Sequence, residues 1–164
     1  QNNNDVVLEP GIYCVDHFTT TGGKITGQGV VFYMRPTHDV WHITSDTDVL
    51  LTAPTSADCQ NSTDLLLNTC PWKGLLLWVD ATPEQFNTPD TAKEVRINGD
   101  AGFSWTGTIY APRSQCTIQG QGTGYALNGQ VICWSVDLEG GSQLDIIYDP
   151  PEFLQTAPRV SLYQ

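Results

Sequence analysis

Apolar and polar residues alternate in three short stretches of the chain, which read EVRINGD (94–100), QCTIQGQG (115–122) and SVDLEGG (135–141). In each stretch an apolar or small residue lies four positions before a glycine, an apolar residue lies two positions before it, and a polar residue separates them. Such alternation puts the apolar side chains on one face of a β-strand. Because the three glycines are 21 and 20 residues apart, the pattern predicts a half-buried strand that returns about every twenty residues. GKITG at 23–27 is predicted to be a shorter copy of it.

A second type of strand is more continuously apolar, and its copies read GVVFYM (29–34), GLLLWVD (74–80), GTIYAP (107–112) and GQVICW (129–134). In the second half of the chain the two types alternate, and Gly107 and Gly129 are 22 residues apart. A period of 20–22 residues with two or three short strands is typical of a coil of a parallel β-helix. Equivalent side chains are then expected to stack as two columns: Val95, Cys116 and Val136, and Ile97, Ile118 and Leu138.

An antiparallel β-sandwich is the alternative, since it also has a strand every 8–12 residues. No Asn-Gly or Asp-Gly pair is placed as a two-residue hairpin, however, and Asn98-Gly99 and Asn128-Gly129 are expected at corners where glycine tolerates positive φ. We find no convincing helix, only a short helical turn after Thr82. The prediction is an all-β, single-domain, right-handed parallel β-helix over residues 1–150, with a loop insertion at 55–73 and a C-terminal tail or cap at 151–164.

Composition narrows the functional classes. Charged residues make up 15% of the chain, below the usual quarter, and 18 acidic against 7 basic residues give a formal charge of −11. Nucleic acid is excluded as a partner because its phosphates need clustered Lys and Arg. No apolar run reaches the roughly 18 residues that a membrane-spanning helix needs. The chain begins at Gln1 without a methionine, which favours a processed form.

The five cysteines contain no Cys-x-x-Cys pair, which weakens a zinc or redox interpretation. Cys59 and Cys70 bracket a polar loop that a disulfide could close, and Cys116 and Cys133 are a second candidate pair, which leaves Cys14 over. Buried, unpaired thiols are the alternative. The low charge and the abundance of Thr, Asn and Gly favour an extracellular setting, and Asn61 begins an Asn-Ser-Thr glycosylation sequon.

Two long stretches, residues 8–34 and 104–150, resemble the β-helical region at the C-terminal end of TadG-like proteins of the bacterial tight-adherence (Flp-type) pilus group. The resemblance rests on the segments PGIY, TGQGVVFY, GTIYAP, GQVI and IIYDP. It implies a β-helix and a bacterial cell-surface location, and it implies no activity. The membrane helix typical of these proteins is missing here, which favours a secreted or polymerised form.

Catalytic chemistry finds little support. Asp46 and Asp48, and Asp145 and Asp149, are the closest carboxylate pairs, but solvated turn residues explain them better than the paired carboxylates of a glycosidase. A groove that cleaves an acidic polymer would need more than seven basic residues. We therefore expect no enzyme.

Metal chemistry is equally weak. His38 and His42 would lie about 13 Å apart on a strand, too far for one metal, and with His17 they are interpreted as polar loop residues. We expect no cofactor; a structural calcium ion at an acidic corner would suit the composition but has no supporting motif.

Aromatic residues are the best candidates for binding, and Trp72, Trp41 and Trp105 are predicted to contact a sugar or a protein partner. Trp78 and Trp134 are left open between core and surface.

The function expected is a secreted, cell-surface structural or adhesive module that self-associates, as an oligomer or a filament, through its coil ends and its tail. Val160, Leu162 and Tyr163 mark the tail segment whose apolar and polar residues alternate, and deletion of 151–164 is expected to abolish assembly while the fold survives. Surface glycans are further expected partners, and a carbohydrate-binding or polysaccharide-cleaving β-helix is the alternative.

Overall fold

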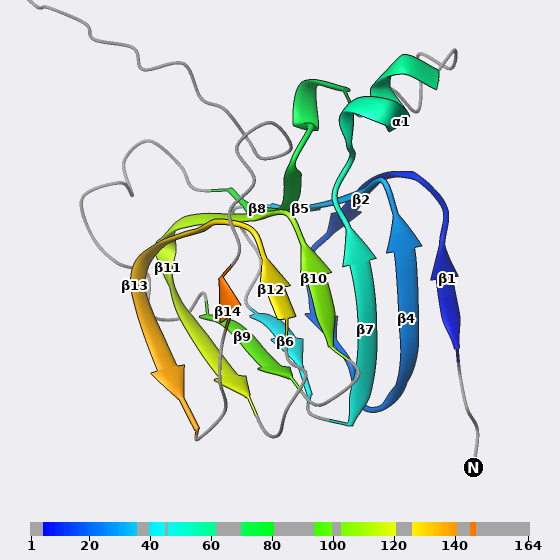
Figure 1. Cartoon of the computed structure of the whole chain (residues 1–164). Helices are drawn as coiled ribbons and strands as arrows, with labels where there is room; N and C mark the ends of the chain where they lie inside the picture. The colour runs from blue at the N-terminus through cyan, green and yellow to red at the C-terminus, as the bar shows by residue number, and fades with distance from the viewer. Residues whose placement is uncertain are drawn as a thin grey trace, which may run out of the picture.

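The chain folds into parallel strands that are wound into a coil (Figure 1). The computed structural model describes residues 5–35, 40–44, 46–61, 70–80, 94–99, 103–120, 126–140 and 145–146. One sheet has the strand order β1-β4-β7-β10-β12-β14, the other has the order β2-β5-β8-β11-β9-β6-β3, and β13 pairs with β11. Every strand pair found among the described residues is parallel. A parallel β-helix is therefore confirmed and the antiparallel sandwich is wrong.

The strands form three faces, because the second sheet bends. The first face consists of β1 (Val6–Leu8), β4 (Gly23–Gln28), β7 (Thr47–Thr52), β10 (Ser104–Thr106), β12 (Ala126–Asn128) and β14 (Asp145–Ile146). The second face holds β2 (Gly11–Val15), β5 (Val30–Met34) and β8 (Leu75–Val79), and the third holds β3 (Phe18–Thr19), β6 (Val40–Ile43) and β9 (Glu94–Gly99). The long strands β11 (Thr108–Gly120) and β13 (Val131–Glu139) cross from the second face to the third, with a register shift between Ala111 and Gln115.

The predicted columns of core residues are present in the expected register. Cys116 pairs with Val95 and Val136, and Ile118 pairs with Ile97 and Leu138. The continuously apolar strands stack in the same way on the second face, where the aligned residues are Phe32, Leu77, Ile109 and Val131. Each coil thus repeats the apolar residues that fill one level of a shared core.

Two details of the predicted repeat are wrong. GKITG is not a copy of the alternating type, because β4 lies on the first face between β1 and β7, whereas β6 is the strand that stacks on β9. The φ angle of Gly129 is not positive, contrary to the prediction for this corner. A Cβ at Gly129 would lie 2.0 Å from the carbonyl oxygen of Gly107, so close stacking of the two corners requires the glycine.

Three threonines hold the corner between the third face and the first. The Thr47 hydroxyl donates to Thr20 Oγ1 at 2.9 Å and accepts the Gly22 N–H at 3.1 Å, while Thr20 Oγ1 also accepts the Thr44 N–H at 3.0 Å. Thr20 and Thr47 are buried, so these bonds satisfy backbone groups that water does not reach.

The 55–73 insertion contains a short helix, α1 (Ser56–Asn61), and a 3₁₀ turn, η1 (Cys70–Trp72). No helix is predicted there from the sequence. Thr55 caps α1: the Asp58 N–H donates to Thr55 Oγ1, and the Thr55 N–H donates to Asp58 Oδ2 at 2.7 Å. This reciprocal capping box, with Asp in place of the commoner Glu, is the sequence feature that marks the start of the helix.

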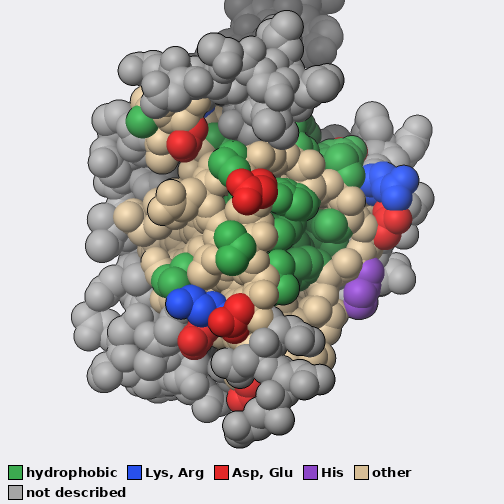
Figure 2. Space-filling model, turned by 90° about the vertical axis from the view of Figure 1, so that its right-hand side faces the viewer, with side chains coloured by type: hydrophobic (Ala, Val, Ile, Leu, Met, Phe, Trp, Pro, Cys, Tyr) green, Lys and Arg blue, Asp and Glu red, His purple; other side chains and the backbone are tan. Residues whose placement is uncertain are grey.

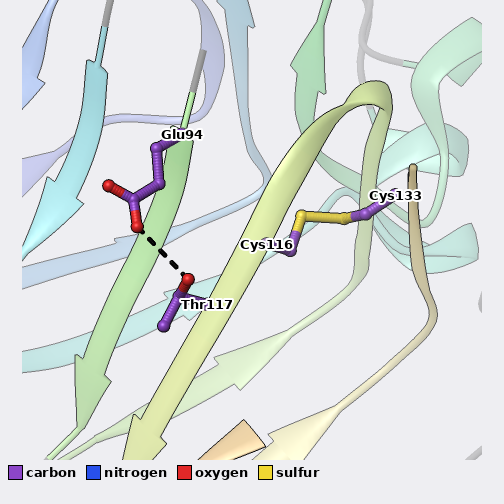
Figure 3. The surroundings of a disulfide bond; sticks show 4 residues. All are labelled: Glu94, Cys116, Thr117 and Cys133. Atoms are coloured by element: carbon purple, nitrogen blue, oxygen red, sulfur yellow. Dashed lines mark hydrogen bonds between the residues drawn. A yellow bond between two sulfur atoms is a disulfide. The ribbon is translucent and has the colours of Figure 1, made fainter. Parts of the chain in front are cut away.

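A disulfide joins Cys116 and Cys133, with a Cα–Cα distance of 6.1 Å (Figure 3). Cys133 lies on the second face and Cys116 on the third, so the bridge spans the corner between them and closes a 17-residue separation. Beside it the Thr117 hydroxyl bonds Glu94 Oε1 at 3.2 Å. Cys14 is free and exposed, and the side chains of Cys59 and Cys70 lie outside the described residues.

Within the described ranges, no helix has the length and apolarity to cross a membrane.

Candidate functional site

Two of the three tryptophans predicted to bind a ligand are buried in the core, and that prediction is wrong for them. Trp41 stacks on Phe18 with ring centroids 4.1 Å apart, and Trp105 stacks on Phe103. Both indoles are fully buried. The physical reason is strand parity: each lies at an inward position of its strand, and the solenoid encloses that face.

A second set of aromatic side chains lies on the outer surface of the second face. Tyr33 on β5 pairs with Trp78 on β8, and Trp78 pairs with Tyr110 on β11. The ring centroids are 6.1 Å and 5.9 Å apart, and each pair is close to perpendicular. These three rings therefore form a row that crosses consecutive coils.

Trp72 packs against this row from the insertion. Its ring lies 4.9 Å from that of Trp78 at an angle of 59°, and η1 places it there. Trp72, Trp78 and Tyr33 border a half-open cavity of about 370 Å³, which is lined by Ile12, Cys14, Val31, Tyr33, Trp72, Trp78 and Asp80. Trp72 is half-buried rather than exposed, and its predicted role in binding stays a prediction.

Asp80 and Tyr33 give this cavity its polarity. The Tyr33 hydroxyl donates a hydrogen bond of 2.6 Å to Asp80 Oδ2. This bond, together with partial burial and the charge of Asp80, raises the pKa of Tyr33 to about 12. Tyr33 therefore remains a neutral phenol at physiological pH, and its O–H group is the donor in the hydrogen bond to the Asp80 carboxyl group.

The structure describes only some of the residues considered for catalysis. Asp46 and Asp48 are exposed and line a shallow hollow with Asp5, Gly23 and Lys24. Asp149 and the side chain of Asp145 lie outside the described residues, as does His38. His17 is exposed and bonds Thr19 Oγ1, whereas His42 is half-buried on β6 rather than in a loop. Among the described residues, no group of three His, Cys, Asp or Glu side chains could hold a metal ion.

The first coil presents a second candidate surface, at the N-terminal end of the solenoid. Among the described strands, β1 pairs with β4 alone, β2 with β5 alone and β3 with β6 alone, which leaves one edge of each without a partner strand. Val6, Val7 and Ile12 are exposed there. Figure 2 shows this end of the molecule, where hydrophobic side chains gather at the centre and most charged side chains lie toward the edge.

The last described coil is equally apolar. Strand β13 pairs with β11 and with no other described strand. Val136 and Leu138, which continue the core columns, are exposed there together with Ile132 and Trp134. A hollow of about 440 Å³ is lined by Ile118, Gly129, Gln130, Val131, Ile132, Val136 and Leu138. Core positions thus reach the surface at this end of the described structure.

Sequence reasoning missed Tyr33, Tyr110 and Asp80, although a signal was available. When the continuously apolar segments are aligned on their first glycine, Tyr33 and Trp78 each lie four positions after that glycine, and Tyr110 lies three positions after it. The structure does not describe the side chains of four residues that were predicted to carry a function: Asn61, Val160, Leu162 and Tyr163.

No protein-family model matches the chain, and comparisons with curated proteins and with solved structures give no significant match. The resemblance to TadG-like proteins therefore stays a prediction.

Proposed function

We propose that this β-helix is an extracellular structural or adhesive module whose copies associate end to end, the last coil of one against the first coil of the next. The observation that carries the proposal is that both ends of the described solenoid expose apolar side chains beside unpaired strand edges. Such edges are templates for pairing with another chain.

The two ends are different surfaces, and this determines the kind of assembly. Val6 at the first coil and Leu138 at the last occupy inward positions, since their partners Ile25 and Ile118 contact the core. A contact between unlike surfaces is heterologous, and with little rotation per copy it builds an open filament rather than a closed dimer. The repeat along the coil would then continue across the junction.

The disulfide supports the extracellular part of the proposal, because structural disulfides persist in oxidising compartments. The resemblance to surface proteins of the pilus group points in the same direction. A role in adhesion would follow from accessible residues that differ from coil to coil, such as Arg96 and Asp137; Thr117 shares their position in the coil between them but is buried.

The test is the mass of the protein in solution, measured by light scattering over a concentration series and by electron microscopy. Wild-type protein is expected to form oligomers that lengthen with concentration. Val6→Lys and Leu138→Lys, at side chains 43% and 59% exposed, place a charge at one end each and are expected to give monomers.

Leu50→Lys is the matched control, because Leu50 is 42% exposed on β7 in the middle of the solenoid. It should assemble as the wild type does. A wild-type protein that is monomeric at all concentrations, or end variants that assemble normally, would contradict the proposal.

A further inference from the structure

We propose that the cavity lined by Tyr33, Trp72, Trp78 and Asp80 binds a small organic cation of the quaternary-ammonium type. The cavity opens on the outer side of the second face, on β2, β5 and β8, and Ile12 and Cys14 on β2 bring it to the edge of the first coil. The inference rests on the aromatic residues and Asp80 that line the cavity, and not on end-to-end assembly.

The three aromatic rings that line the cavity do not lie in one plane. The ring of Trp78 is inclined by 59° to that of Trp72 and by 81° to that of Tyr33. Rings inclined in this way cannot all stack on one flat ligand. Their faces carry partial negative charge, and a compact cation gains from several faces at once.

The charge of the cavity has the sign that such a ligand needs. Among the described residues that line it, Asp80 is the one that carries a charge. The whole chain carries a formal charge of −11, which attracts cations and repels anions over long distances.

A sugar fits the same cavity less well. Each pyranose hydroxyl that loses water needs a hydrogen-bond partner. Apart from the two indole N–H groups, the described side chains of the lining offer the Asp80 carboxylate, the Cys14 thiol and the Tyr33 hydroxyl, which already bonds Asp80. A trimethylammonium group needs no hydrogen bond, and a volume of about 370 Å³ lies in the usual range for small-molecule sites.

Calorimetric titration of the whole chain with choline chloride tests the proposal. The key comparison is 3,3-dimethyl-1-butanol, which has the shape of choline without its charge. Choline is expected to bind at least about tenfold more tightly than the neutral alcohol, and cellohexaose is expected to give no saturable heat.

Variants locate the binding. Asp80→Asn removes the charge but keeps an acceptor for Tyr33, and Trp72→Ala removes one wall from outside the sheets; each is expected to weaken choline binding about tenfold. Trp134→Ala changes an exposed tryptophan that does not line the cavity, and it should bind choline as the wild type does. Equal affinity for the neutral alcohol, tighter binding of cellohexaose, absence of choline binding, or an unchanged Asp80→Asn variant would each overturn the proposal.

Discussion

At the scale of single residues, the phenol of Tyr33 is the group among the described residues whose pKa is clearly shifted. Its hydrogen bond to Asp80 places a carboxylate beside a group that would become an anion. The bond therefore favours the protonated phenol and opposes the phenolate. Since the same pair lines the cavity, its titration reports on the local structure of that site.

The pKa of Tyr33, raised to about 12 from about 10 in unfolded chains, makes folding stability depend on alkaline pH. Between these two values the unfolded chain has lost the proton and the folded chain has kept it, so this group stabilises the fold below pH 10 and the contribution is lost as pH rises through 12. Denaturant unfolding of wild type and Tyr33→Phe at pH 8 to 12 measures it. The free energy of unfolding should fall less steeply with rising pH in Tyr33→Phe than in the wild type. Equal slopes of the two proteins would contradict the assignment.

Thr47 makes a second prediction at this scale. Thr47→Val keeps the shape of the side chain but removes the acceptor of the Gly22 N–H and one of the two donors to Thr20 Oγ1, which keeps the Thr44 N–H. Loss of partners for buried polar groups should lower the free energy of unfolding by about 1–3 kcal/mol. Thr52→Val, at a half-buried position of the same strand, is the control and should change stability much less.

At the scale of the element, the long strands β11 and β13 dominate the C-terminal half. They pair over two faces and are tied by the Cys116–Cys133 bridge. The corner between the faces is the place where pairing is interrupted. A covalent link across this corner therefore stabilises the coil where hydrogen bonding between the strands is weakest.

Replacement of both bridge cysteines by serine should destabilise the protein by about 3 kcal/mol, the loop-closure value for a 17-residue separation. The measurement is equilibrium unfolding in denaturant, and a change under about 1 kcal/mol would argue against this estimate. Cys14→Ser, at an exposed free thiol, is the control and should leave the midpoint of unfolding unchanged.

At the scale of the whole molecule, the sequence predicted the solenoid well because its core repeats. Val95 and Cys116 could be aligned without a structure, since alternation reveals which side chains point inward. The continuously apolar strands carry no such signal. Leu77 and Trp78 are neighbours of similar hydrophobic character, yet one lies in the core and the other on the outer surface.

A shift of one residue would exchange the two sides of a strand. Trp41 and Trp105 do not belong to the continuously apolar strands: they lie in VWHI (40–43) and FSWT (103–106), where the alternation of apolar and polar residues indicates an inward side chain that the prediction of binding overlooked. The cavity escaped prediction because it joins β2, β5, β8 and the insertion, and their proximity follows from the coil rather than from any local motif.

End-to-end association of the solenoid is tested most directly by mixing Val6→Lys with Leu138→Lys. Each variant alone keeps one native end and lacks its complement. If the last coil of one copy binds the first coil of the next, the mixture has a single native junction, because Val6→Lys supplies the last coil and Leu138→Lys the first. Light scattering of the equimolar mixture should therefore give a dimer, while each variant alone gives a monomer. A mixture that stays monomeric, or one that grows beyond the dimer, would contradict head-to-tail association.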